Sequence, residues 1–206
     1  MSFLSLVKYL IVIVAGYLLG SMSTSLLLSK LGWGKDVRKH SSGNAGATNM
    51  ARVFGLGAGF ATLAGDMLKA ALALWLGSAL LGDPGIAAGG GACILGHCFP
   101  VFHDFHGGKG ISVGAMIGLA IDWRVFVGIV VVFLIVAFLT KKVSAGSLAA
   151  SIAVSILAIV FHVSTPKLVL AIFAMCVAIF QHRSNIKRLA EGTDADFKAA
   201  EPEKKK

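Results

Sequence analysis

The chain has 206 residues, of which 56% are hydrophobic and only 14% are charged. This composition excludes an ordinary soluble domain, and a mean hydropathy of +0.82 indicates an integral membrane protein. A net charge of +9 would suit nucleic acid, but the basic residues lie between apolar runs, so anionic lipid and phosphate are the better partners and no nucleic acid is expected.

Apolar segments alternate with short polar stretches along the whole chain. They predict an all-α integral membrane protein with about seven transmembrane helices, several of them short or broken. The predicted spans are Phe3–Ser29, Val53–Leu81, Gly85–Val101, Ile111–Ile121, Val125–Thr140, Ser147–Val163 and Leu168–Phe180. Gly16 and Gly20 form a GxxxG packing face in the first span. Asp66 and Lys69 interrupt the second span, which predicts a short broken helix followed by a better one.

The basic residues are distributed unevenly between the predicted loops. With the N-terminus outside, one face collects eleven Lys and Arg residues and the other only three. This positive-inside bias predicts an outside N-terminus, a cytoplasmic C-terminus and cytoplasmic placement of the loops with interesting chemistry. Residues 1–190 form one membrane domain in this interpretation, and residues 191–206 form a polar, disordered tail.

The stretch Gly96–Gly110, GHCFPVFHDFHGGKG, combines three histidines, four glycines and one lysine between two apolar segments. Gly107 and Gly108 would let backbone N–H groups approach a phosphate, and Lys109 would add charge. The stretch is not a P-loop, because its glycine spacing differs and Lys109 precedes glycine. An interfacial loop that anchors lipid headgroups is the alternative, and both remain open.

Metal binding by the same stretch is a minor alternative. His97 could ligate a metal with His103, His106 or Asp104, but no carboxylate-rich helix accompanies these residues. We therefore expect no metal and no cofactor.

A second polar stretch, Asp36–Arg52, combines guanidinium groups with hydroxyls, amides and glycines, as phosphate-oxygen binding requires. Its candidate residues are Arg38, Ser42, Asn44, Thr48, Asn49 and Arg52. The alternative is a loop rich in helix caps that leads into a helix at Val53. A capping loop needs only one Ser or Asn, so the density of polar residues favours binding.

Three smaller features have a structural and a functional interpretation each. Asp66 and Lys69 lie within a span, where an ionisable group has a high free-energy cost and is therefore a candidate for function. Their i,i+3 spacing also suits a structural ion pair. Ser144 and Ser147 follow Lys141-Lys142 and resemble a helix N-terminus with a hydroxyl cap. The stretch HRSNIKR, residues 182–188, reads by itself as a basic flank of the last span.

Gly110-Ile111-Ser112-Val113-Gly114 fits the GxSxG nucleophile elbow, which would make the chain a serine hydrolase acting through Ser112 and a histidine. That elbow requires a strand, and the sequence predicts none. Gly110, Gly114 and Gly118 at four-residue spacing instead predict a close helix-packing face.

Taken together, these stretches resemble the bacterial acyl-phosphate:glycerol-3-phosphate acyltransferase family (PlsY type). The resemblance extends over nearly the whole chain, up to about Asp194. The family motif GSGNxGATNxxR corresponds to SSGNAGATNMAR here, with Ser41 in place of glycine. The motif GHxFPxFxxFxGGKG is matched throughout by residues 96–110.

Two further motifs and one short element of the family are also present. The motif HRxNIxRLxxGxE is matched from His182 onward, with Asp194 in place of glutamate. The motif DxxKG has Ala70 in place of its glycine. Ser144 and Ser147 correspond to the SxxS element.

The resemblance implies transfer of an acyl chain from acyl phosphate to the 1-hydroxyl of glycerol 3-phosphate, giving lysophosphatidic acid and phosphate in the first step of phospholipid biosynthesis. It also implies the bacterial cytoplasmic (inner) membrane. The expected partners are acyl phosphate, glycerol 3-phosphate and membrane lipids, and we expect a monomer. The predicted catalytic residues are His182, Lys109, Arg52 and Ser42. The predicted substrate-binding residues are Arg38, Asn44, Thr48, Asn49, Lys69, His97, Gly107, Gly108, Ser144, Ser147, Asn185 and Arg188.

A membrane transporter of a phosphorylated solute is the rival hypothesis. It would explain the basic loops and the ionisable pair within a span. Transport requires binding groups near the midplane that both sides can reach, whereas the polar groups here cluster at one face. The chain also lacks the HxxxxD pair shared by soluble-type acyl-CoA acyltransferases, which favours acyl phosphate over acyl-CoA as donor.

Overall fold

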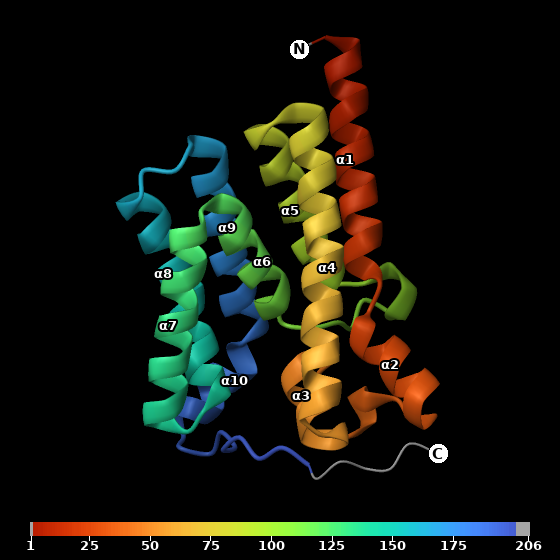
Figure 1. Ribbon diagram of the computed structural model, residues 1–206. Coiled ribbons are helices and arrows are strands. Elements are labelled where there is room, and N and C mark those ends of the chain that lie inside the picture. The colour runs from red at the N-terminus through yellow and green to blue at the C-terminus, as the bar shows by residue number, and fades with distance from the viewer. Residues whose placement is uncertain (1, 201–206) are drawn as a thin grey trace.

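The structure is a computed structural model that describes residues 2–200, and within this range it contains helices and no strand. The longer helices run beside one another, with the N-terminus at one end of the bundle (Figure 1). The α-helices are α1 (Phe3–Ser21), α2 (Thr24–Trp33), α3 (Ala47–Phe54), α4 (Leu56–Leu81), α5 (Asp83–Cys98), α6 (Ile111–Ile121), α7 (Trp123–Thr140), α8 (Val143–Val160), α9 (Thr165–Gln181) and α10 (Arg183–Ala190). Two short 3-10 helices are η1 (Val37–Lys39) and η2 (Val101–His103).

The predicted class, an all-α integral membrane protein with several short or broken spans, is confirmed. Five segments are long and apolar enough to cross a membrane: Phe3–Trp33, Leu56–Leu81, Asp83–His103, Trp123–Thr140 and Val143–Val160. Helices α9 and α10, which meet at an angle of 60°, make a sixth when the bent pair is counted as one span. The remaining predicted span, Ile111–Ile121, is α6, which at 11 residues is too short to cross a bilayer of about 30 Å by itself.

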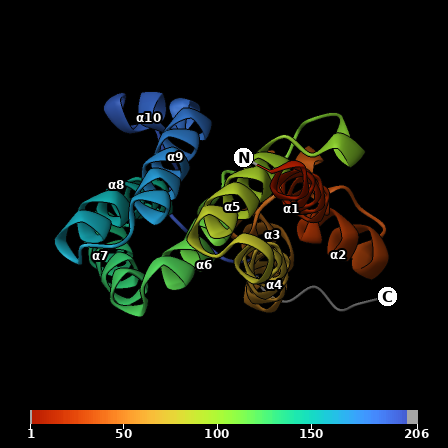
Figure 2. The same ribbon diagram turned by 90° about the horizontal axis from the view of Figure 1, so that it is seen from above.

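Helix α5 lies at the centre of the fold. It packs against α1 and α4 on one side and against α9 on the other, while α7 packs against α8 and α8 against α9. Seen along the helices, α1–α4 and α7–α10 form two groups, with α5 and α6 between them (Figure 2). The main buried apolar cluster, with Cys93, Ile117 and Leu170 among its members, joins the two groups.

Glycines allow the backbone of α5 to approach its neighbours. A Cβ atom on Gly20 would lie 2.2 Å from the carbonyl oxygen of Cys93, and one on Gly16 would lie 2.8 Å from that of Gly89. The predicted GxxxG packing face of α1 is therefore confirmed. The predicted glycine face of α6 is wrong at Gly114, where an added Cβ would meet no atom within 4 Å.

The helix breaks lie at other positions than predicted. The first span is not one helix, because the chain leaves helical geometry at Met22 and the Ser23 hydroxyl caps α2. The second span is unbroken at Asp66 and Lys69, since α4 is continuous from Leu56 to Leu81. Its break lies earlier, at Gly55, whose φ of 89° separates α3 from α4.

Two predicted loop assignments are also wrong. The polar stretch before Val53 is partly helical, because α3 begins at Ala47. Ser144 and Ser147 lie inside α8 rather than before it, and its N-cap residue, Lys142, makes no side-chain cap. Ser144 instead bonds to a distant carboxylate, described below.

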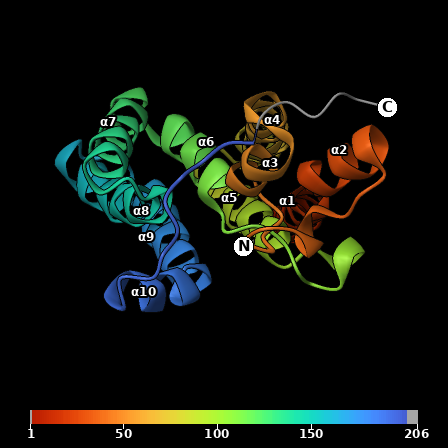
Figure 3. The same cartoon turned by 90° about the horizontal axis from the view of Figure 1, so that it is seen from below.

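The chain after α10 crosses the end of the bundle at which α3 and α10 lie, which we call the α10 end (Figure 3). Residues 191–200 contain no helix, and the Phe197 amide donates to the Lys141 carbonyl while the Ala200 amide donates to the Ala51 carbonyl. The chain thus connects the two helix groups. The domain boundary at residue 190 and the disordered tail remain predictions, and residues 201–206 lie outside the described range.

Candidate functional site

A buried ionic cluster closes the break between α1 and α2. Lys69 Nζ lies 3.0 Å from Asp66 Oδ1 and donates to the carbonyl oxygens of Gly20 at 3.0 Å and Met22 at 2.7 Å. The Thr24 hydroxyl donates to the same Asp66 oxygen at 3.0 Å. The ion pair therefore satisfies carbonyl groups that the end of α1 leaves without intrahelical partners. This arrangement favours the structural interpretation of the pair.

The same lysine orients a histidine beside the glycine turn. Lys69 Nζ lies 3.1 Å from His97 Nδ1, and because an ammonium group only donates, Nδ1 accepts and Nε2 carries the proton. The His97 carbonyl accepts from the Gly108 amide at 3.0 Å. A Cβ atom added to Gly107 would lie 2.1 Å from the His97 carbonyl oxygen, and one added to Gly108 would lie 2.2 Å from His97 Nε2. Only glycine fits these two positions, and the turn they form places Lys109.

Asn49 organises the other polar stretch. It is 1% exposed, and its Nδ2 donates to the carbonyls of Val37, His40 and Asn44 while its Oδ1 accepts from the Ser42 amide. These bonds fold residues 37–49 into a compact loop. Ser41 in this loop has a φ of 50°, a conformation that glycine adopts without strain, which accounts for the glycine of the family motif.

Both polar stretches face a cavity of about 510 Å³. One end is polar and lies at the α10 end, with Arg52, Lys109 and Arg188 among its lining residues. The other end runs between α4, α6, α7 and α9 and is apolar, lined by Phe60, Leu63, Gly114, Phe126, Ile129, Phe133, Leu134 and Met175. Gly114 is open because it forms part of this wall. The cavity thus suits an anion attached to an apolar chain.

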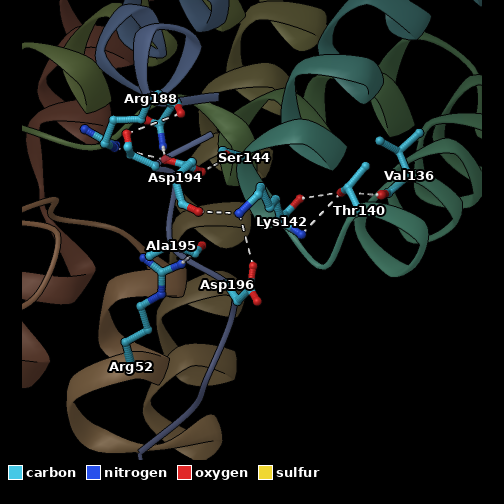
Figure 4. A network of polar contacts seen from close by, with 11 residues as sticks. Arg52, Val136, Thr140, Lys142, Ser144, Arg188, Asp194, Ala195 and Asp196 are labelled. Carbon is cyan, nitrogen blue, oxygen red and sulfur yellow. Dashed lines mark hydrogen bonds and ion pairs between the residues drawn. The ribbon is translucent and has the colours of Figure 1, made fainter. Parts of the chain in front are cut away.

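A hydrogen-bonded network crosses the polar end. Lys109 Nζ donates to Asn185 Oδ1, and Asn185 Nδ2 donates to Asp194 Oδ1 at 3.2 Å. The same carboxylate accepts from Arg188 Nε at 3.0 Å and from the Ser144 hydroxyl. Figure 4 shows the Asp194 carboxylate beside Ser144 and Arg188, where α8 and α10 come together.

The network shifts the ionisation of its members. Burial and the nearby Arg188 together lower the pKa of Lys109 to about 8, against the opposing effect of Asp194. Burial opposes the ionisation of Asp194, but hydrogen bonds from Ser144 and Arg188 outweigh it and lower the pKa of this carboxyl. At neutral pH, Lys109 is therefore a cation close to its titration point and Asp194 is an anion.

His182 lies between α9 and α10 and lines the same cavity. His182 Nδ1 lies 2.8 Å from the Ala178 carbonyl oxygen. Because a carbonyl only accepts, Nδ1 carries the proton and donates it, and Nε2 of the neutral ring is left as an acceptor.

Most predicted site residues lie around this one cavity. Those that line it are Ser42, Asn44, Thr48, Asn49, Arg52, His97, Lys109, Ser144, Ser147, His182, Asn185 and Arg188. Arg38, Gly107 and Gly108 line a second cavity of about 350 Å³, which shares Asn44 and Lys109 with the first. Lys69 lines neither cavity and contacts the site only through His97.

Two alternatives that the sequence analysis disfavoured are a metal site and a serine nucleophile. Among residues 2–200, no group of three or more His, Cys, Asp or Glu side chains is arranged to hold a metal ion. Ser112 lines the cavity, but it lies in the first turn of α6, and within the described range no strand leads into it. Among the described residues, the nucleophile elbow therefore lacks the strand that it requires, in agreement with the sequence analysis.

The sequence analysis missed Asp194, which is 7% exposed and faces the cavity. The signal was available, because Asp194 stands where the last family motif has glutamate. It was assigned to the polar tail because acidic and basic residues dominate the sequence after Glu191.

The fold and the cavity define an integral membrane protein with a cavity that is lined by cations at one end and by apolar side chains at the other. Residues 10–192 match the family described as glycerol-3-phosphate acyltransferase. The glycerol-3-phosphate acyltransferase of Trichlorobacter lovleyi is 42% identical over 189 residues, which cover 91% of this chain and 96% of that protein. The chain belongs to the glycerol-3-phosphate acyltransferase family.

Solved structures of a related protein have the same fold. The crystal structure of PlsY (YgiH), described as an integral membrane glycerol 3-phosphate acyltransferase, matches in its glycerol 3-phosphate form with a TM-score of 0.88 and 31% identity. That match covers 92% of this chain and 96% of the other. The lysophosphatidic acid form of the same protein matches with a TM-score of 0.84 and 30% identity.

Proposed function

We propose that this protein transfers a fatty acyl group from acyl phosphate to the 1-hydroxyl of glycerol 3-phosphate, producing lysophosphatidic acid and inorganic phosphate. The observation that carries this proposal is that one and the same cavity has a cationic end and an apolar end. An acyl phosphate has the same two parts, and the acceptor adds a second phosphate for the cationic end. The glycerol 3-phosphate and lysophosphatidic acid forms of the related PlsY support this acceptor and product.

Arg52 and Lys109 are the main phosphate ligands in this proposal. Arg52 Nη2 donates to the Ala195 carbonyl, while its buried Nε has no hydrogen-bond partner among the described residues. Such a donor is available to a phosphate oxygen. Lys109 uses one of its three hydrogens on Asn185 and can direct the others into the cavity. Ser42 adds a hydroxyl group at the same end, where the Ser144 hydroxyl instead donates its hydrogen to Asp194.

The chemical step exchanges one C–O bond for another. The glycerol 3-phosphate hydroxyl attacks the acyl carbon, its bond to that carbon forms, and the bond from the acyl carbon to the phosphate oxygen breaks. The hydroxyl proton moves to an oxygen of the departing phosphate, which leaves as inorganic phosphate. The protein then contributes by placing two anions together and by stabilising the charge that develops on the acyl and phosphate oxygens.

His182 orients the attacking hydroxyl in this scheme and does not remove its proton. Its Nε2 can accept a hydrogen bond from the hydroxyl because Nδ1 is committed to Ala178. Nδ1 donates to a neutral backbone carbonyl and not to a carboxylate, so no bonded anion would stabilise the imidazolium that a base becomes, which favours proton transfer to the substrate phosphate.

The proposed topology has an outside N-terminus and a cytoplasmic α10 end, in the bacterial cytoplasmic membrane. The loops rich in Lys and Arg, including those around Arg38, Lys142 and Arg183, support this orientation. Both water-soluble substrate headgroups would then reach the cavity from the cytoplasm. We further propose that the protein acts as a monomer, because the described chain forms the whole cavity by itself.

The rival transporter hypothesis has less support. A transporter requires a binding site that each side of the membrane can reach in turn. The cationic lining residues Arg52, Lys109 and Arg188 instead gather at one end of the cavity, and apolar side chains line the rest.

The test is product analysis with purified protein in detergent micelles, given a long-chain acyl phosphate and glycerol 3-phosphate. We expect lysophosphatidic acid and phosphate in a one-to-one ratio. Acyl-CoA and acyl carrier protein thioesters are matched control donors and should give little or no product. Comparable turnover with acyl-CoA would refute the assigned donor, and no acylation with any donor would refute the proposed function.

A further inference from the structure

A carboxylate lies in a cavity that we assign to two phosphates. Asp194 is the one acidic residue among the described residues that line the cavity, and it is 7% exposed. A buried negative charge would repel each substrate if it faced them without compensation. Its presence at the cationic end therefore requires an explanation.

The two oxygens of Asp194 are occupied by residues from two helices. Oδ1 accepts from Asn185 Nδ2 at 3.2 Å and from Arg188 Nε at 3.0 Å, both on α10, and Oδ2 accepts from the Ser144 hydroxyl on α8. All three donors line the cavity. The carboxylate therefore fixes the relative positions of three residues that we assign to substrate binding.

Asp194 also determines which way the Asn185 amide points. Because Nδ2 donates to Asp194, Oδ1 must lie on the opposite side, where it accepts from Lys109 Nζ. A reversed amide would present its NH₂ group to the ammonium, and Lys109 would lose this contact. Asp194 thus acts on Lys109 through Asn185.

The backbone around Asp194 is held as well. The Asp194 amide donates to the Arg188 carbonyl at 3.1 Å, and the Asp194 carbonyl accepts from Lys142 Nζ. The next residue, Ala195, accepts from Arg52 through its carbonyl at 3.3 Å. Figure 4 shows this short segment joining Arg52, Lys142 and Arg188, which come from three separate helices or their ends.

We propose that Asp194 is a positioning residue for acyl transfer: its carboxylate fixes Ser144, Arg188 and the Asn185–Lys109 pair in the geometry that the phosphates require. Arg188 and Lys109 keep donors for substrate, because Asp194 takes one of the five N–H donors of Arg188 and Lys109 retains two hydrogens. The negative charge also offsets the mutual repulsion of the cations while the cavity is empty. This inference rests on the proposed function.

The alternative is that Asp194 occupies a phosphate position and leaves when substrate binds. Its removal would then relieve competition and strengthen phosphate binding. The two accounts predict opposite effects of the same substitution.

The test compares Asp194→Asn and Asp194→Glu with the matched control Asp196→Asn. Asp196 lies two residues away and its carboxylate pairs with Lys142 at 3.1 Å, but it is exposed and does not line the cavity. Initial rates at varied glycerol 3-phosphate and acyl phosphate give kcat and KM, and inhibition by inorganic phosphate measures anion binding. Gel filtration and thermal unfolding in micelles measure the folded fraction.

We expect Asp194→Asn to lower kcat by roughly 10- to 100-fold per folded molecule, as misplacement of reacting groups does, with a smaller change in KM. Asp194→Glu, which restores the carboxylate, should recover part of the loss, and Asp196→Asn should stay within about twofold of wild type. Unchanged kcat in Asp194→Asn, tighter inhibition by phosphate, or a loss explained entirely by unfolded protein would each overturn the inference. An inactive wild-type protein would instead refute the proposed function.

Discussion

Lys109 should give the enzyme an alkaline limit close to pH 8. Its pKa is lowered to about 8 because the ammonium group is buried beside Arg188. The charged fraction should therefore fall from about nine-tenths at pH 7 to about one-tenth at pH 9, since each pH unit changes the ratio of the two forms tenfold. Only the charged form donates to a phosphate, so kcat/KM should fall about tenfold over this range.

The assay measures phosphate release and lysophosphatidic acid from pH 6.5 to 9.5, with an enzyme-free blank for spontaneous hydrolysis of the donor. The profile of kcat/KM reports the free enzyme, so its limb should lie near the pKa of the empty site. The alkaline limb of the kcat profile should lie at a higher pH than that of kcat/KM, because bound phosphates favour the charged lysine and raise its pKa.

Lys109→Arg is the matched control, because a guanidinium group stays charged throughout this range. It should lower the absolute rate, since its geometry differs, but it should remove the alkaline limb. A wild-type kcat/KM that stayed level to pH 9.5 in folded protein would refute the assignment of Lys109 as a charged phosphate ligand.

Three further substitutions test other parts of the site. Arg52→Ala should lower kcat about 100-fold or more without loss of folding, because a charge-assisted donor to the phosphate is removed; near-normal turnover would show that Arg52 is not a ligand. His182→Gln should retain substantial turnover if His182 only orients the hydroxyl, whereas background activity with preserved glycerol 3-phosphate binding would make it the base. Lys69→Met should destabilise the protein by about 3 kcal/mol, because Asp66 becomes a buried unpaired charge; thermal unfolding should show Asp66→Asn/Lys69→Met to be the more stable of the two variants.

The sequence was sufficient to predict the helical class and most of the cavity lining. Apolar run length predicted the spans, and Gly16 and Gly20 predicted the close contact with α5. The residues of the two glycine-rich polar stretches line one cavity because the turn at Gly107-Gly108 and the bonds of Asn49 orient both stretches toward it.

The positions of the helix breaks could not be predicted from local pattern. Asp66 and Lys69 look like an interruption in the sequence, but their charges compensate each other and the true break lies at Gly55. Ser144 looks like a helix cap, but its hydroxyl bonds to Asp194, 50 residues away in the chain. Both outcomes depend on contacts between segments that are distant in the sequence.

The role of Gly114 shows a limit of a different kind. Four-residue glycine spacing describes one face of a helix, but it does not say whether a helix or an open cavity meets that face. At Gly118 an added Cβ would lie 2.8 Å from Ile129 Cδ1, whereas at Gly114 it would enter the apolar end of the cavity.

The ionic cluster at the end of α1 has a consequence for insertion of the chain into the membrane. Helix α4 carries both Asp66 and Lys69, and each charge within the bilayer costs about 2.5–3.5 kcal/mol during insertion. Lys69 finds its carbonyl partners on Gly20 and Met22, which the ribosome makes before α4. Synthesis in this order gives the first span time to reach the membrane first, so that both carbonyl groups are available when Lys69 arrives. A permuted chain in which α4 preceded α1 should therefore insert less efficiently, because the pair would meet lipid before its acceptors were made.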